Sequence, residues 1–289
     1  MELKQLKYFV TVVQEGNISK AAEKLSISQP PFSTKLKELE IELGVVLFER
    51  GVRKIEMTEA GTMFYQRALS ILELTELAQQ ELADYKEGKL GTLRIGMISS
   101  VSTSLANEWI PEFHKTYPDI HLDLFEGNTY EQIEKLKNNL IELAVVRTPF
   151  NAESLECTTL RKENMVALGD SSFFSGITSD TITLNDIQKQ PLIIYRRWEK
   201  ILSDAFYQYG CEPNIFCRSD DARTTISMAD ACLGISIVPE SALALSRNQR
   251  LMKKVISQNN LQSSICVLRN PNSYLSTLAE LFYQFLVNY

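Results

Sequence analysis

The segment of residues 17–44, NISKAAEKLSISQPPFSTKLKELEIELG, constrains the fold more than any other part of the sequence. It reads as two helices separated by a short turn, because Ser26-Ile27-Ser28 interrupts the helical pattern with side chains that favour caps over helix interiors. Ser28 is predicted to cap the second helix. Pro30 and Pro31 then fall in its first turn, where a missing N–H costs no intrahelical hydrogen bond. The segment predicts a helix-turn-helix, with any amphipathic helical hairpin as the alternative.

The second helix of this pair has two different faces. One face repeats large apolar residues at spacings of four, three and four, which predicts a buried stripe of Phe32, Leu36, Leu39 and Leu43. The rest of the surface carries hydrogen-bonding side chains of the size that reaches base edges and phosphates from a helix in a DNA major groove. These side chains are Gln29, Ser33, Thr34 and Lys37.

The detailed sequence of residues 21–61 resembles the amino-terminal signature of LysR-type transcriptional regulators. The matching positions are Ala21-Ala22, Leu25, Ser28-Gln29-Pro30, Ser33, Leu39-Glu40, Leu43-Gly44, Leu47-Phe48, Arg50 and Thr58-Glu59-Ala60-Gly61. Phe32 and Thr34 depart from the pattern, since the family often carries a small residue and a basic one there, and this bears on base preference. The resemblance implies a winged helix-turn-helix that binds double-stranded DNA, a linker helix that pairs subunits and a small-molecule effector domain.

Net charge alone does not indicate a nucleic-acid partner. The chain carries a formal charge of −6, and residues 1–60 hold nine Lys or Arg and nine Asp or Glu, so that segment is neutral. DNA binding would therefore rest on the local placement of cations. Basic residues do gather in the second helix and just after it, at Lys35, Lys37, Arg50, Arg53 and Lys54.

Residues 44–58 lose helical periodicity and contain Gly51 beside basic residues, which predicts a β-wing. Arg53 and Lys54 are expected at its tip, near the phosphate backbone or the minor groove, with a plain surface hairpin as the alternative. The predicted DNA-binding residues are Gln29, Pro30, Ser33, Thr34, Lys37, Arg50, Arg53 and Lys54.

A long helix is predicted to begin at Thr58-Glu59, which supplies a capping hydroxyl and an acidic residue in the first turn. One heptad seam runs along it, formed by Phe64, Ala68, Ile71, Thr75, Ala78, Leu82 and Tyr85. Such a seam fits either a helix packed on its own domain or a dimerisation helix. The resemblance favours the second interpretation and implies a homodimer or homotetramer.

From residue 91 onward, short apolar strands alternate with amphipathic helices, as in a parallel α/β sheet. Two such subdomains resemble the effector domain of the same family, which has the periplasmic-binding-protein architecture. The predicted fold is therefore α/β with an N-terminal all-α winged helix-turn-helix. The expected parts are 1–58 (DNA binding), 59–90 (linker helix and hinge) and 91–289 (effector binding), the last with subdomain I at about 91–161 and 266–289 and subdomain II at about 162–265.

Ligands of open α/β sheets bind beyond the carboxyl ends of the strands, where helix N-termini converge. Polar residues at such places are Ser99, Ser100, Ser102, Asn128, Thr129, Arg147, Tyr195, Arg196 and Arg197. Hydroxyl-rich helix starts facing guanidinium groups suit a small anionic effector. The alternatives are ordinary N-caps for the hydroxyls and a solvated surface pair for the adjacent arginines. Arg147 is favoured because a charge directly after a buried strand needs a partner. The predicted effector-binding residues are Ser99, Ser100, Ser102, Thr129, Arg147 and Arg196.

Other chemistries find little support. His114 and His121 have no acidic or cysteine cluster at ligand spacing, and the sequence has no GxSxG elbow, P-loop or Rossmann glycine string. No catalytic residue, metal site or cofactor is therefore predicted, and an enzyme is the weaker class. No apolar run reaches the ~18 residues of a membrane span. The first ten residues lack the apolar core of a signal peptide. A cytoplasmic protein with no membrane partner is expected.

The five cysteines fit free thiols in a reducing compartment. The alternative to small-molecule sensing is a thiol/disulfide redox sensor that uses Cys211 and Cys217. The resemblance to LysR-type regulators allows this, since some members of that family are switched by disulfide formation. Against it, Cys217 falls in a predicted strand, and free cysteines are more often inert core residues.

Overall fold

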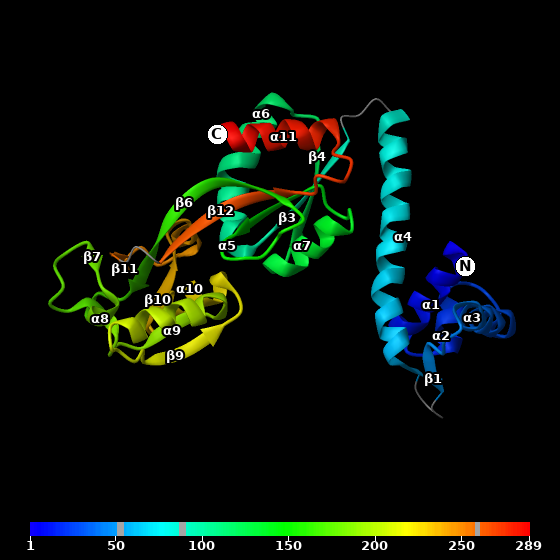
Figure 1. The fold of residues 1–289 in the computed structure, drawn as a ribbon, viewed down its shortest axis with the longest axis horizontal. Helices are drawn as coiled ribbons and strands as arrows, with labels where there is room; N and C mark the ends of the chain where they lie inside the picture. Colours follow the sequence, from blue (N-terminus) through cyan, green and yellow to red (C-terminus); the bar gives the residue numbers. More distant parts are fainter. Residues whose placement is uncertain (51–54, 87–90, 258–260) are drawn as a thin grey trace. The chain divides into compact units, whose positions relative to one another are not determined.

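The computed structural model describes residues 1–50, 55–86, 91–257 and 261–289 (Figure 1). The chain divides into two compact units, Met1–Gly88 (unit 1) and Lys89–Tyr289 (unit 2). Each unit has an apolar core of its own. Within the described ranges, no helix is both long and apolar enough to cross a membrane.

Unit 1 begins with three helices, α1 (Leu3–Glu15), α2 (Ile18–Lys24) and α3 (Gln29–Leu43). Gly16 and Gly44 end α1 and α3 at φ values of 62° and 69°, a left-handed conformation that costs glycine little because it lacks a Cβ. Asn17 caps α2 by accepting hydrogen bonds from the next turn, and Ser28 occupies the N-cap position of α3. The predicted helix-turn-helix is confirmed.

A short wing and a long helix follow. Strands β1 (Phe48–Arg50) and β2 (Ile55–Met57) pair antiparallel, as expected for a wing. The Thr58 hydroxyl accepts a hydrogen bond from the Gly61 N–H at 2.9 Å and so caps α4 (Glu59–Lys86). A Cβ at Gly61 would collide with the Leu47 carbonyl, so the close approach of α4 to the wing requires glycine there.

The core of unit 1 contains several aromatic rings and, among the described side chains, takes in the first half of α4. The fully buried ring of Phe9 packs at 5.1 Å from both Phe48 and Phe64. Ala68 is also in this core, and α4 residues pack against it as far along as Leu72. This half of the seam therefore packs on its own domain. Further along, Leu82 is 70% exposed.

Unit 2 consists of two α/β lobes joined by the long strand β6 (Glu156–Gly169). The first part of β6 runs antiparallel beside β12 (Gln262–Arg269) in the first lobe, and its last residues, from Met165 onward, pair with strands of the second lobe (Figure 1). In the first lobe the strand order is β4-β3-β5-β12, and in the second it is β6-β10-β8-β9. The parallel strands are β3 (Thr92–Met97), β4 (His121–Glu126), β5 (Leu143–Arg147), β8 (Leu192–Tyr195), β9 (Ile215–Ser219) and β10 (Ile235–Pro239). At the edge of the second lobe, β11 (Met252–Ile256) pairs with β6 and with β7 (Thr181–Ile182).

Helices cover these sheets. The first lobe contains α5 (Ser99–Ser104), η1 (Leu105–Trp109), α6 (Ile110–Thr116), α7 (Thr129–Lys137) and the C-terminal α11 (Thr277–Asn288). The second lobe contains η2 (Ser171–Phe174), α8 (Leu184–Ile187), η3 (Arg196–Trp198), α9 (Glu199–Gln208), α10 (Ala222–Asp230) and η4 (Glu240–Leu245). Within the first-lobe core, the rings of Phe113 and Phe282 meet edge to face at 4.9 Å.

Strands β6 and β12 are longer than the short apolar strands that the sequence predicts from residue 91 onward. The first part of β6 contains exposed polar side chains such as Thr159 and Lys162. A strand of this composition has no continuous apolar run, so the sequence pattern does not indicate its full length.

Candidate DNA-binding and effector sites

The outer face of α3 presents the side chains predicted to read DNA. Gln29, Thr34 and Lys37 are exposed and Ser33 is half-buried, whereas the stripe that includes Phe32 is buried. Gln29 accepts a hydrogen bond from the Ser19 hydroxyl at 3.1 Å, and Thr34 donates one to the carbonyl of exposed Pro30 at 3.1 Å. The helix thus holds short polar groups and two lysines on its solvent side, Lys37 and the Glu38-paired Lys35.

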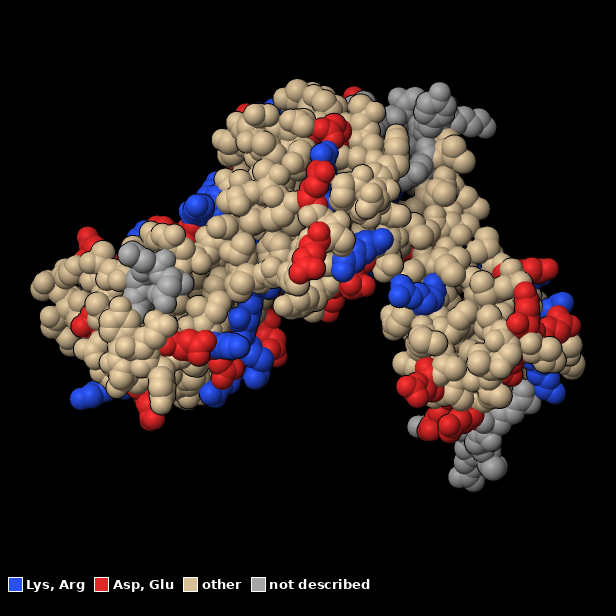
Figure 2. All heavy atoms as spheres, viewed as in Figure 1, with Lys and Arg blue, Asp and Glu red and all other residues tan. Residues whose placement is uncertain are grey.

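The basic residues of the wing are only partly described. Arg50 is the last residue of β1, and the structure describes its backbone but not its side chain. Arg53 and Lys54 lie outside the described residues. On the face of unit 1 shown in Figure 2, basic side chains lie among acidic ones, in keeping with the neutral count for residues 1–60. The charge contribution of the wing to DNA binding remains a prediction.

A cavity of about 380 Å³ opens between the two lobes of unit 2. It lies at the carboxyl ends of β3, β4, β8 and β9, where ligands of α/β sheets bind, and it falls in the size range of about 300–1,000 Å³ that is typical of small-molecule sites. Its lining residues are Ser99, Glu126, Gly127, Asn128, Glu131, Tyr195, Asp220, Asp221 and Arg223.

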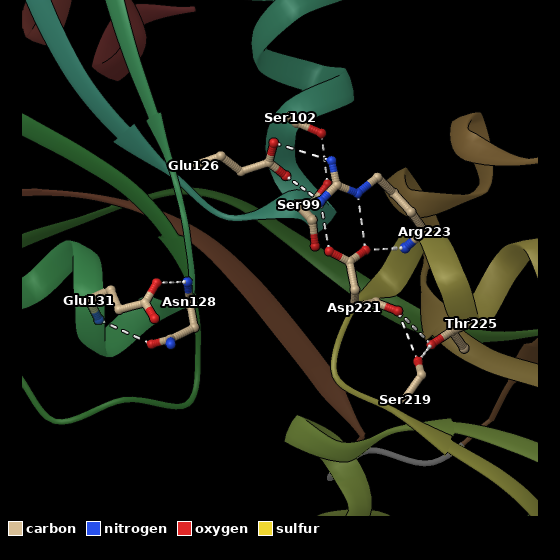
Figure 3. Close-up of polar contacts among 9 residues, drawn as sticks. All are labelled: Ser99, Ser102, Glu126, Asn128, Glu131, Ser219, Asp221, Arg223 and Thr225. Atoms are coloured by element: carbon tan, nitrogen blue, oxygen red, sulfur yellow. Dashed lines mark hydrogen bonds and ion pairs between the residues drawn. The ribbon is translucent and has the colours of Figure 1, made fainter. Parts of the chain in front are cut away.

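Arg223 connects the two lobes across this cavity (Figure 3). Its Nη2 lies 2.9 Å from a Glu126 oxygen in the first lobe and 2.7 Å from an Asp221 oxygen in the second. Burial disfavours the charged form of Asp221, but hydrogen bonds from the side chain and backbone of Arg223 outweigh it, and the pKa of Asp221 is lowered. Ser99 also hydrogen-bonds to this carboxylate from the first lobe.

The first-lobe wall of the cavity ends in the N-terminus of α7. Asn128 and Glu131 form a reciprocal capping box there, with bonds of 3.0 Å (Figure 3). The Glu131 carboxylate is therefore engaged by a backbone N–H, as the other acidic groups of the cavity wall are engaged by arginines.

Arg147 does not present its charge to the cavity, which corrects the expectation placed on it. The side chain is fully buried, and its Nη1 lies 2.9 Å from Glu163, a carboxylate with only 5% of its side chain exposed. Its remaining bonds go to the Ser100 carbonyl and to the hydroxyls of Ser241 and Ser263. The buried charge of Arg147 does have the partner that it requires, and that partner, Glu163, lies inside the protein.

The two adjacent arginines of η3 have opposite environments. Arg196 is 54% exposed, and its Nε lies 2.7 Å from Asp220. Arg197 instead turns inward to the first lobe, where it donates to the Thr129 hydroxyl at 2.5 Å and to the carbonyls of Arg147 and Pro149. Its Nε is buried and has no hydrogen-bond partner among the described residues.

The charge of Arg197 is therefore uncompensated. Burial lowers the pKa of its guanidinium, and no carboxylate in the described part of the chain pairs with it. The sequence pointed to both arginines but could not tell which one turns inward. Position after a strand does not fix the direction of a side chain.

The four predicted hydroxyl groups have different environments. Ser99 lines the cavity, and Thr129 is buried and accepts a hydrogen bond from Arg197. Ser102 donates back to the Ser99 carbonyl at 2.8 Å, so its role is within the helix. Ser100 is buried, and its hydroxyl has no partner among the described residues.

The two cysteines named in the redox alternative have different environments. Cys211 is buried in the core of the second lobe and donates to Asn185 at 3.2 Å. Cys217 is half-buried in β9. All five cysteines are free thiols.

A helix-turn-helix with a wing, followed by a two-lobed α/β domain with a ligand-sized cavity between its lobes, defines a transcriptional regulator with an effector domain. The chain belongs to the LysR family of such regulators. Residues 3–62 match the model of the bacterial regulatory helix-turn-helix protein, lysR family, and residues 86–289 match that of the LysR substrate binding domain.

Individual relatives agree with this assignment. The chain is 31% identical over 290 residues to the HTH-type transcriptional regulator BsdA of Bacillus subtilis, covering 98% of this chain and 99% of that one. It is 31% identical over 254 residues to the HTH-type transcriptional regulator BenM of Acinetobacter baylyi, covering 85% and 82%. Both relatives are transcriptional regulators.

Solved structures of the family share the fold. The crystal structure of CbnR, a LysR family transcriptional regulator, matches with a TM-score of 0.82 at 25% identity, covering 100% of this chain and 99% of that one. Full-length CbnR complexed with its target DNA matches with a TM-score of 0.83 at 26% identity and the same coverage.

Proposed function

We propose that this regulator binds a specific DNA site through α3 and the wing, and that it does so as a homodimer or homotetramer. Residues 1–58 would bind DNA, 59–90 would pair subunits and 91–289 would bind the effector. The outward face of α3 supports the first role, and the family member CbnR has been solved with its target DNA. Bacterial DNA lies in the cytoplasm, so that is the proposed site of action.

The second half of α4 supports the pairing role. Among the described residues, the apolar core of unit 1 takes in α4 only as far as Leu72, yet apolar side chains continue along the helix. Leu74 and Leu82 are 37% and 70% exposed. A solvent-facing row of this kind is stabilised when a second helix covers it.

We further propose that the effector carries an anionic group and binds between the lobes of unit 2. The observation behind this is Arg197, a largely buried cation for which the described residues provide no carboxylate partner. It donates to the Thr129 hydroxyl at the N-terminus of α7. A carboxylate there would neutralise the guanidinium and accept further bonds from hydroxyls and backbone N–H groups. Arg197 thus takes the role first expected of Arg147 and Arg196.

The acidic residues of the cavity do not oppose this proposal. Arg223 lies within 3 Å of both Glu126 and Asp221, and Arg196 offsets Asp220. Those carboxylates are already paired, whereas Arg197 has no carboxylate partner within the ranges that the structure describes. A buried guanidinium of this kind is stabilised by an anion.

A thermal-shift screen with mono- and dicarboxylates set against mono- and diamines tests the proposal. A carboxylate is expected to raise the Tm, and Arg197→Met is expected to weaken its binding about ten- to a hundredfold, because a charge-assisted bond is worth roughly 1.5–3 kcal/mol. Arg196→Met is the matched control, since it removes the neighbouring exposed arginine. Each shift is measured against the variant's own ligand-free Tm.

The opposite result would identify a different effector class. Stabilisation by an amine, lost in Glu131→Gln and retained in Arg197→Met, would place a cationic ligand on the acidic wall of the cavity.

A further inference from the structure

Two cysteines that are far apart in the sequence lie together on the paired strands β6 and β12 of unit 2. In the register of β6 and β12, Cys157 is paired with Leu268 and Cys266 with Thr159. Paired residues face the same side of a sheet and so do alternate residues, so the two cysteines are diagonal neighbours on one face. The Thr159 hydroxyl lies 3.8 Å from the Cys266 sulfur, and the Cys157 thiol is near enough to contribute to the raised pKa of Cys266.

We propose that Cys157 and Cys266 form an oxidisable thiol pair that closes to a disulfide by exchange with a low-molecular-weight disulfide such as oxidised glutathione. This pair is distinct from Cys211 and Cys217, and the proposal does not depend on the effector. The two thiols have unequal access: Cys157 is exposed, whereas Cys266 is 1% exposed.

That difference fixes the order of the chemistry. The Cys157 thiolate attacks oxidised glutathione, forming a mixed disulfide and releasing one glutathione. The Cys266 thiolate then attacks the Cys157 sulfur, forming the protein disulfide and releasing the second glutathione. Two protein thiols are oxidised, and one glutathione disulfide is reduced to two thiols.

The environment of Cys266 controls the closing step. Burial, reinforced by the neighbouring Cys157 thiol, raises the pKa of Cys266 to about 11. The attacking thiolate is therefore scarce at neutral pH, and the closing rate should rise about tenfold per pH unit well below that pKa. The mixed disulfide on Cys157 should accumulate first and then decay.

The position of the pair gives the disulfide a structural consequence. The chain between Cys157 and Cys266 contains the entire second lobe. A diagonal pair has Cβ atoms farther apart than the roughly 3.5–4.5 Å of a disulfide, so closure must draw β6 and β12 together. The bulge in their pairing lies between Ile265 and Cys266, at the point where that adjustment is needed.

The test uses the full chain, reduced and then exposed to oxidised glutathione at several pH values, with peptide mapping by mass spectrometry under non-reducing conditions. A Cys157–Cys266 link within one chain is expected, forming faster at higher pH. Cys266→Ser should stop at the mixed disulfide on Cys157, and Cys157→Ser should form no link. Cys266→Ala provides a second version of the buried substitution, with folding checked by circular dichroism.

Cys232→Ser is the matched control, because Cys232 is the other exposed cysteine. That variant should form the Cys157–Cys266 link at the wild-type rate. Three outcomes would overturn the proposal: a mixed disulfide on Cys157 that persists in the wild type as it does in Cys266→Ser, a link between Cys211 and Cys217 in its place, or links only between chains.

Discussion

Replacement of Glu163 by glutamine should lower the free energy of unfolding of unit 2 by about 3–5 kcal/mol, because it leaves the fully buried Arg147 guanidinium without a counter-charge. Glutamine keeps the shape of the side chain and one acceptor oxygen. It can therefore still accept from Ser241, whose hydroxyl lies 2.8 Å from the present carboxylate. Retention of that bond places the expected loss near the lower limit, at about 3 kcal/mol.

Urea denaturation monitored by tryptophan fluorescence measures this loss. The chain has two tryptophans, Trp109 and Trp198, and both are buried in unit 2, so the signal reports on that unit. Glu156→Gln is the matched control, since Glu156 pairs with Arg269 on the surface and should contribute less than about 1 kcal/mol.

A double variant separates the charge from the packing. Arg147→Met combined with Glu163→Leu removes both members of the ion pair and should recover most of the lost stability, since apolar replacements of buried pairs are often neutral or stabilising. A Glu163→Gln loss no larger than that of Glu156→Gln would refute the reasoning. It would mean that the serine hydroxyls and the Ser100 carbonyl suffice for the guanidinium.

Three further outcomes are expected. Gln29→Ala should weaken binding to the specific DNA site by ~1–3 kcal/mol and leave binding to random DNA nearly unchanged. Equal losses of affinity, measured by titration with each DNA, would contradict a contact between Gln29 and a base. Leu82→Asp should produce smaller species in sedimentation without unfolding unit 1, because Leu82 is exposed, whereas a seam residue such as Ile71 packs on the core of that unit. An unchanged oligomer would exclude pairing through this part of α4. Asp221 has a lowered pKa in the folded protein, so its carboxylate stabilises the fold above its unfolded pKa of about 4, and this contribution is lost as the pH falls through the lower folded value. Asp221→Asn should therefore reduce the loss of unfolding free energy at acid pH, measured by urea denaturation at several pH values. An unaltered loss at acid pH would contradict the contribution assigned to this carboxylate.

The sequence was sufficient where local rules decide the structure. The stripe from Phe32 to Leu43 defined α3, and Gly16 and Gly44 marked the ends of helices through their left-handed conformation. The carboxyl-end rule located the edge of the sheet where the cavity opens. Each of these inferences depends on residues within a few turns of one another.

The sequence was insufficient where the direction of a side chain or a long-range pairing decides the structure. Arg147 and Arg197 both follow strands, yet one is paired inside the protein and the other reaches between the lobes. Asp221 also follows a strand, as the predicted serines do, but a carboxylate does not fit the hydroxyls and cations expected around an anionic effector. The proximity of Cys157 and Cys266 depends on strand register, which no local pattern contains.

Strand β6 belongs to both lobes and β12 comes late in the sequence, and together these two facts determine the order in which unit 2 can be completed during synthesis. The second-lobe strands emerge from the ribosome before β12, so that lobe can assemble on β6 while the first lobe still lacks β12 and α11. During that interval β5, whose residues all become buried, has an unpaired edge that can recruit another nascent chain. The last 28 residues therefore close the first sheet and remove an aggregation-prone edge, and a chain that ends before Gln262 would leave that edge permanently open.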